Sequence, residues 1–262
     1  MALIRAAKQK YEVDSAVYQR VLSFCELYTQ WRGAWAAQNP LLAVPRALDV
    51  ILNPPIFNTV YSGGDPAQLT ALFPHLTELW RGRCVTQLVG QVSSSIKFQA
   101  LRAALQCTPQ GNVLDLAVTV FTCQHGLCCT SGRALHWPAA MAHPCAWRHD
   151  SLFLPERPRW EIVEKHSAAR WLTSVAEKIL GCKAWDPEGL VLDKQFDRAV
   201  EVVLACGQHP LQVTAQAMDL LDVRLNCGRC AADPKFGHLS RKVMNWRNAV
   251  SRHTVLIGKR RN

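Results

Sequence analysis

The sequence lacks the apolar runs that mark membrane and secreted proteins. Its longest apolar stretch, Val113 to Phe121, is interrupted by polar residues and is about half as long as a membrane-spanning helix requires. Arg5 and Lys8 appear before any apolar segment of signal-peptide length. We therefore expect an intracellular protein, in the cytoplasm or the nucleus, with no membrane association.

The sequence also lacks the motifs of common catalytic sites. It contains no Gly-rich phosphate loop, no Gly-x-Ser-x-Gly, no His-Glu-x-x-His and no paired-carboxylate pattern. Only Glu156 and Glu161 lie close enough in sequence to the first cysteine cluster to act as a general base for a hydrolytic metal. Since no low-complexity tract is present either, we expect a folded protein that is not an enzyme.

No segment sustains an alternation of apolar and polar residues, so strands should be short and confined to the cysteine loops. Helical spacing of apolar residues is common instead, and the first helix should begin at an N-cap on Asp14 or Ser15. Helices are expected over 14–38, 45–52, 74–92, 167–181, 193–206, 212–223 and 243–250, and a serine-rich linker over 92–95 leads to the segment 97–107. The predicted fold is mainly α, a helical hairpin or bundle with small zinc-stabilised loop modules, and the first and third helices could form the hairpin.

A proline-punctuated bridge over 153–160 is the best candidate for a domain boundary. We expect a helical region over 1–110 and a Cys/His module over 111–152. A C-terminal helical region over 153–262 should end in a second module of Cys-x2-Cys, Trp and His.

The charge is strongly positive. Thirty Lys and Arg against twenty Asp and Glu give a net charge of +10 and a pI near 9.2, which makes nucleic acid a partner to consider. The excess is spread thinly, however, and the only dense run is Lys259-Arg260-Arg261. A protein partner is therefore favoured, and nucleic-acid binding is the alternative.

Eleven cysteines are many for 262 residues, but their number is odd. In a reducing compartment, clustered cysteines indicate metal ligands or buried apolar side chains rather than disulfides. The first cluster contains Cys123, Cys128 and Cys129, followed by His143 and Cys145. Four Cys and His ligands form the closed tetrahedral set typical of structural zinc.

The spacing leaves the second ligand open. It reads Cys-x4-Cys-x14-His-x-Cys with Cys128, or Cys-x5-Cys-x13-His-x-Cys with Cys129. A set of buried free thiols near a surface histidine is the alternative interpretation. His125, His136 and His149 also lie near the cluster and are expected to be ordinary loop histidines.

A second cluster begins at Cys227-Gly228-Arg229-Cys230. A thioredoxin-like redox pair is disfavoured because the motif follows a helical run and no βαβ pattern surrounds it. Cys227 and Cys230 could instead form one edge of a second zinc site, with His253 as the third ligand. His238 or water could complete it.

Two stretches carry a resemblance to the C-terminal portion of F-box-like proteins of basidiomycete-type fungi. The matching runs are 78–81, 114–123, 137–138, 143–145, 205–210, 218–222, 227–230 and 243–250. They are similar to the family's His-x-Cys ending, its Met-Asp-x-Leu-Asp, its Cys-x2-Cys and its Met-x-Trp-Arg-x-Ala-Val. The F-box itself is absent from this sequence, and no histidine follows His253.

The resemblance implies a zinc-stabilised recognition module of the kind that binds substrates in F-box-like proteins. Together with the missing catalytic motifs, it favours a non-enzymatic, zinc-finger-like protein-interaction module. The alternative function is a basic zinc-containing nucleic-acid-binding protein.

Overall fold

The computed structural model describes residues 2–39, 43–51, 53–125, 128, 133–147, 176–192, 195–227, 243–251 and 257–259. The fold is mainly helical with two small sheets, as the sequence predicted. In this described part of the chain, no helix combines the length and the apolar character needed to cross a membrane.

The chain forms two compact units, each built from two separate stretches. Unit 1 comprises Met1–Cys84 and Ala146–Asp186, and unit 2 comprises Val85–Cys145 and Pro187–Asn262. These units do not coincide with the consecutive segments 1–110, 111–152 and 153–262 that composition indicated. Each unit therefore depends on contacts between residues far apart in the sequence, which composition along the chain does not reveal.

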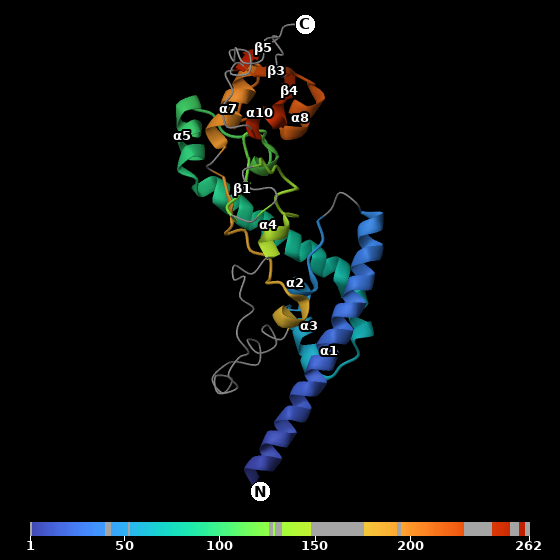
Figure 1. Cartoon of the computed structure of the whole chain (residues 1–262). Helices are drawn as coiled ribbons and strands as arrows, with labels where there is room; N and C mark the ends of the chain where they lie inside the picture. The colour runs from blue at the N-terminus through green and yellow to red at the C-terminus, as the bar shows by residue number, and fades with distance from the viewer. Residues whose placement is uncertain are drawn as a thin grey trace, which may run out of the picture. The chain divides into compact units, whose positions relative to one another are not determined.

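Unit 2 contains short helices and both sheets (Figure 1). Its elements are α5 (Ile96–Leu105), η2 (Val113–Asp115), β1 (Thr122–Cys123), β2 (Leu190–Val191), α7 (Phe196–Ala205), α8 (Ala215–Leu220), β3 (Arg224–Cys227), β4 (Val243–Asn245), α10 (Trp246–Ser251) and β5 (Ile257–Lys259). β1 pairs with β2, and β3 lies between β4 and β5, all antiparallel.

Several expected elements of unit 2 differ from the structure. Residues 243–250 divide into β4 and α10, because Val243 to Asn245 pair with Arg224 to Asn226 of β3 before the helix begins. The segment 114–121, for which the sequence predicted no element, contains the end of η2 and isolated bridges at Leu116 and Phe121 with a turn between them, and its apolar side chains are buried. β2 and β5 lie outside the cysteine loops, so the expectation that strands would be confined there was wrong.

Unit 1 is built from α1 (Ala2–Gln38), α2 (Ala47–Ile51), α3 (Pro54–Ser62), the 3-10 helix η1 (Pro66–Leu72) and the first turns of α4 (Phe73–Ser94). Its core holds the apolar stripe predicted for α1, including Val17, Phe24 and Tyr28, which are at most 1% exposed. Tyr28 meets Phe73 edge to face, with ring centroids 5.1 Å apart. The helix expected from Pro74 thus supplies this core mainly through its first turn.

Helix α1 begins at Ala2, twelve residues before the expected cap at Asp14. The added segment is rich in Ala, Leu, Lys, Gln and Glu, which are good helix formers, and contains no glycine or proline. The helix therefore continues towards the N-terminus without needing a cap at that position.

A buried carboxylate connects the two stretches of unit 1. Asp49 is 7% exposed and accepts three hydrogen bonds, from the backbone N–H of Arg46 at 2.9 Å, the backbone N–H of Trp185 at 2.6 Å and the indole N–H of Trp147 at 2.7 Å. The guanidinium of Arg46 also lies over the Trp147 ring. Because a buried charge needs such partners, Asp49 makes the Trp147–Trp185 stretch part of the same folded unit.

We expect Asp49→Asn to lower the free energy of unfolding by about 1–3 kcal/mol, because an amide presents an N–H₂ group to donors that need an acceptor. Urea denaturation followed by tryptophan fluorescence measures the change. Asp65→Asn is the matched control, since Asp65 caps η1 by accepting from the Ala67 N–H and asparagine caps equally well. Equal effects of the two changes would contradict the assigned role of Asp49.

The same residue should give a pH signature. Burial raises the pKa of Asp49 above its ordinary value of 3.8, although the hydrogen bonds from Trp185, Trp147 and Arg46 oppose the shift. The folded chain then holds this proton more tightly than the unfolded chain. The free energy of unfolding should therefore fall as pH rises from 3.8 through the raised pKa, and Asp49→Asn should lack this contribution.

Candidate metal centre

Four side chains of the first cysteine cluster meet in unit 2: Cys123, Cys128, His143 and Cys145. Their sulfur atoms and one imidazole nitrogen all lie within 4.8 Å of one another. All four residues are buried, with Cys128 the most exposed at 8%. The structure thus brings together a group predicted from sequence spacing, with Cys128 in the second position, while Cys129 lies outside the described residues.

Strand β1 sets the position of Cys123. Cys123 pairs with Leu190 and Thr122 pairs with Val191, and the backbone N–H of Gln124 donates to Gly189 O at 2.9 Å. Strand β1 itself ends at Cys123. The Cys128 N–H donates to His125 O at 3.0 Å, which turns the chain so that the second thiol approaches the first.

His143 and Cys145 arrive on a series of tight turns. The N–H of Ala140 donates to His136 O, that of Met141 to Pro138 O, and that of His143 to Ala140 O, at 3.0–3.3 Å. Cys145 follows on η3 (Pro144–Trp147). The site has two arms, the segment that leads to Cys123 and the segment that leads to His143. The two arms pair where the second begins, because Leu135 and Phe121 exchange both backbone hydrogen bonds, at 2.8 and 2.9 Å.

The spacing of these atoms suits a tetrahedral metal ion. With zinc–sulfur bonds of about 2.3 Å and zinc–nitrogen bonds of about 2.0–2.1 Å, the edges of the tetrahedron are about 3.6 Å for S–N and about 3.8 Å for S–S. Cys128 Sγ lies 3.4 Å from His143 Nε2. This edge matches a four-ligand site, whereas separations of up to 4.8 Å within the group must shorten by about 1 Å to hold an ion.

The pKa values of two thiols in the group are raised by burial. Burial, followed by hydrogen bonds to Cys128 and Cys123, raises the pKa of the Cys145 thiol to about 12. Burial also raises the pKa of Cys123. A divalent cation reverses this preference, because a coordinating thiol is deprotonated, so binding of a metal ion releases protons.

The remaining predicted ligands fall largely outside the described residues. Cys129, Cys230 and His253 lie outside them. Cys227 is the last residue of β3, where its backbone pairs with Ile257, but its side chain is not described. The second zinc site therefore stays a prediction.

Two residues that pack around the group were not singled out from sequence as parts of the site. His136, expected to be an ordinary loop histidine, is 4% exposed, and its Nε2 lies 3.3 Å from Ala117 O. Gly189 lies so close to His125 that a Cβ atom added at residue 189 would lie 2.6 Å from His125 Nε2. The apolar sequence around His136, from Leu135 to Met141, was the available signal for burial.

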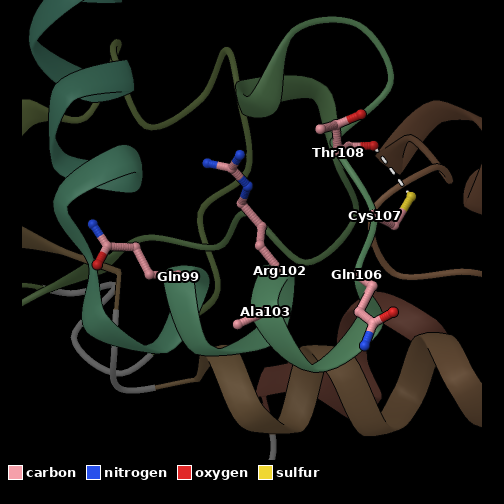
Figure 2. Close-up of a pocket in the computed structure, with 6 residues that line it drawn as sticks. All are labelled: Gln99, Arg102, Ala103, Gln106, Cys107 and Thr108. Carbon is pink, nitrogen blue, oxygen red and sulfur yellow. Dashed lines mark hydrogen bonds between the residues drawn. The ribbon is translucent and has the colours of Figure 1, made fainter.

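Unit 2 also has an open hollow of about 330 Å³ at the end of α5. Figure 2 shows the side chains that line it: Gln99, Arg102, Ala103, Gln106, Cys107 and Thr108. The lining contains one charged side chain, Arg102, and neither a histidine nor a carboxylate. It therefore offers no acid–base pair, and the Cys–His group is the stronger candidate for the functional site.

Comparison of the chain with protein-family models, with curated proteins and with solved structures gives no match. The chemical class of the site comes from its own donor atoms. Three thiols and one imidazole, all buried, constitute a possible metal-binding Cys3His group.

We expect Cys123→Ser and Cys145→Ser each to reduce the bound metal to below about a tenth of the wild-type content. The melting temperature should fall by about 10 °C or more, because metal binding is coupled to local folding. Metal content is measured by plasma mass spectrometry and stability by calorimetry. Cys107→Ser is the control, since the Cys107 thiol is not in the Cys3His group: it donates to Thr108 O at 3.3 Å (Figure 2) and accepts from Gln212 Nε2 at 4.0 Å. Wild-type metal content in both ligand variants would refute the assignment.

The two adjacent cysteines should behave differently. Cys128→Ser should lose the metal because Cys128 Sγ belongs to the group, whereas Cys129→Ser should retain it. Competition with a chromogenic chelator measures the two affinities. Equal and severe losses would mean that both cysteines contribute to binding.

Proposed function

We propose that this chain is a non-enzymatic protein-interaction module whose unit 2 is held together by one structural zinc ion. The observation that carries the proposal is the closed set of four buried protein ligands, Cys123, Cys128, His143 and Cys145.

Zinc is the metal that this donor set favours. Three thiolates and an imidazole are too soft for magnesium or calcium, which prefer oxygen ligands. A tetrahedral Cys3His set is one of the common structural zinc sites. The buried position also suits a metal that contributes to folding, because coordination bonds offset the cost of burying these groups.

The same ligand set argues against catalysis by the metal. A catalytic zinc keeps one position for water or substrate, with three protein ligands around it. Here four protein side chains occupy the tetrahedron, which leaves no position for a substrate. We therefore assign the ion a structural role.

A protein partner is favoured by the surface of unit 2. Leu220 is 82% exposed, its neighbour Leu221 is 44% exposed, and Ile96 is 81% exposed. Exposed leucines next to one another are suited to a protein interface. The proposed relationship to F-box-like proteins, taken from the motifs at 218–222 and 243–250, points to the same class of function.

The compartment we propose is the cytoplasm or the nucleus. Its support is the state of the cysteines, since all eight whose side chains the structure describes are free thiols. Reducing compartments preserve such thiols for metal binding.

The net charge of +10 supports a second candidate function, the binding of nucleic acid. Phosphate contacts release counterions, so affinity for a short DNA or RNA would fall linearly with salt concentration in logarithmic form. Fluorescence anisotropy with labelled duplex and single-stranded oligonucleotides tests this candidate. A steep slope with sub-micromolar affinity at physiological salt would replace the protein-interaction proposal.

The leading proposal predicts that proteins captured from a nuclease-treated cell extract are retained at both 0.15 M and about 0.3 M salt, because apolar contacts are little screened. Capture should be lost with Cys145→Ser, which removes the metal, and reduced by Leu220→Asp, which should leave the metal in place. Leu72→Asp, at a half-exposed leucine of unit 1, is the matched control. Capture that disappears after nuclease treatment would contradict the proposal.

A further inference from the structure

A network of side chains outside the metal ligands connects the C-terminal part of unit 2 to the segment that carries His143. Its centre is Asp219 near the end of α8. The Arg247 guanidinium donates to both oxygens of Asp219, at 2.8 and 2.6 Å, and the Trp246 indole N–H donates to Oδ1 at 2.8 Å. Arg247 also lies over the Trp246 ring, 4.7 Å from its centroid. The orientation of the Trp246 indole is therefore fixed from two sides.

The fixed indole contacts a histidine of the metal-binding segment. Trp246 and His136 meet edge to face, with ring centroids 4.9 Å apart. Burial and the nearby charge of Arg247 lower the pKa of His136 to about 4, so its imidazole is neutral at neutral pH. Since Ala117 O can only accept, Nε2 must carry the proton that it donates across 3.3 Å. The ring is thus held by one hydrogen bond and one aromatic contact.

His136 occupies the point where the two arms of the site come together. Its neighbour Leu135 pairs with Phe121, two residues before Cys123. Its carbonyl accepts the Ala140 N–H and so begins the turns that end at His143. A shift of residue 136 would therefore displace ligands on both arms. The Ala134 N–H adds a further link by donating to Ser251 Oγ of α10 at 3.2 Å.

We infer that Asp219, Trp246 and Arg247 are positioning residues for the metal site: they hold His136 and thereby the spacing between the Cys123 arm and the His143 arm. This inference rests on the proposed zinc site and deepens it. It assigns a role to residues that lie about 75 to 125 positions from the ligands in sequence and that are not ligands themselves. Coupling is reciprocal, so occupation of the site by metal must equally stabilise the contact of α10 with residue 136.

The test measures metal affinity in variants of the full chain that keep all four ligands. Asp219→Asn should raise the zinc dissociation constant about tenfold, as losses of supporting residues around metal ligands commonly do. Asp222→Asn is the matched control, because the Asp222–Arg224 ion pair is exposed and Asp222 has a φ of 43°, which asparagine tolerates well. Trp246→Phe keeps a ring against His136 without the indole N–H, and should recover part of the affinity lost in Trp246→Leu.

Two readouts separate positioning from a general loss of stability. The visible absorption of bound Co²⁺ should show weakened tetrahedral bands in Asp219→Asn but not in Asp222→Asn. Hydrogen exchange at residues 244–250 should slow on zinc addition in the wild type, and this protection should be lost in Asp219→Asn.

The outcomes are distinguishable. A wild-type chain that binds no metal overturns the proposed zinc site itself. If the wild type binds zinc, and the folded variants Asp219→Asn and Trp246→Leu have the same zinc affinity and the same Co²⁺ spectrum as the wild type, the positioning inference alone is overturned.

Discussion

Four ionisable side chains converge in a buried volume of unit 2, and this convergence determines much of the surrounding structure. Buried thiols and an imidazole gain little from one another, and burial disfavours the ionised thiolates. A divalent ion would reverse the preference for neutral thiols, because each deprotonated ligand then bonds to a central positive charge. Among the described residues between β1 and η3, Leu135 forms an isolated bridge with Phe121, and residues 137–142 form turns. A metal bond is the interaction best able to hold such a segment in one conformation.

Unit 1 is stabilised in a different way. Its long helix α1 packs an aromatic face on Phe73, and the second stretch of the unit is attached through the hydrogen bonds of Asp49. Burying a carboxylate costs free energy, but the three hydrogen-bond donors offset that cost. Because hydrogen bonds are directional, they also fix how Trp147 and Trp185 lie against Asp49. Unit 2 joins its two stretches by backbone pairing instead, as between Cys123 and Leu190 and between Ala117 N–H and Val213 O, while the Cys3His group lies within the first of these stretches.

The sequence was informative wherever a pattern is local. The apolar stripe from Val17 to Tyr28 predicted the buried face of α1, and the clustered cysteines with His143 predicted the metal group, because ligand type and spacing are both visible along the chain. The spacing alone did not distinguish adjacent Cys128 and Cys129, and Cys129 lies outside the described residues. The division into units was also inaccessible, because it depends on distant pairings such as Cys123 with Leu190.

Other differences have equally physical reasons. Residues 243–250 have a helical spacing of apolar side chains, yet Val243 to Asn245 extend to complete a sheet with β3. Tertiary pairing overrides local preference in such short segments. The apolar residues around His136 were a sign of its burial, but its contact with Trp246 could not be predicted, because Trp246 lies far along the chain.

X-ray absorption at the zinc edge tests the central claim most directly. The sample is the full chain with Cys227→Ser and Cys230→Ser, so that only the first cluster can contribute sulfur. The account predicts one zinc per chain, with three sulfur neighbours at about 2.3 Å and one nitrogen neighbour at about 2.0–2.1 Å. A chain purified without chelators that holds no zinc, or a zinc whose shell includes oxygen and fewer than three sulfurs, would contradict it.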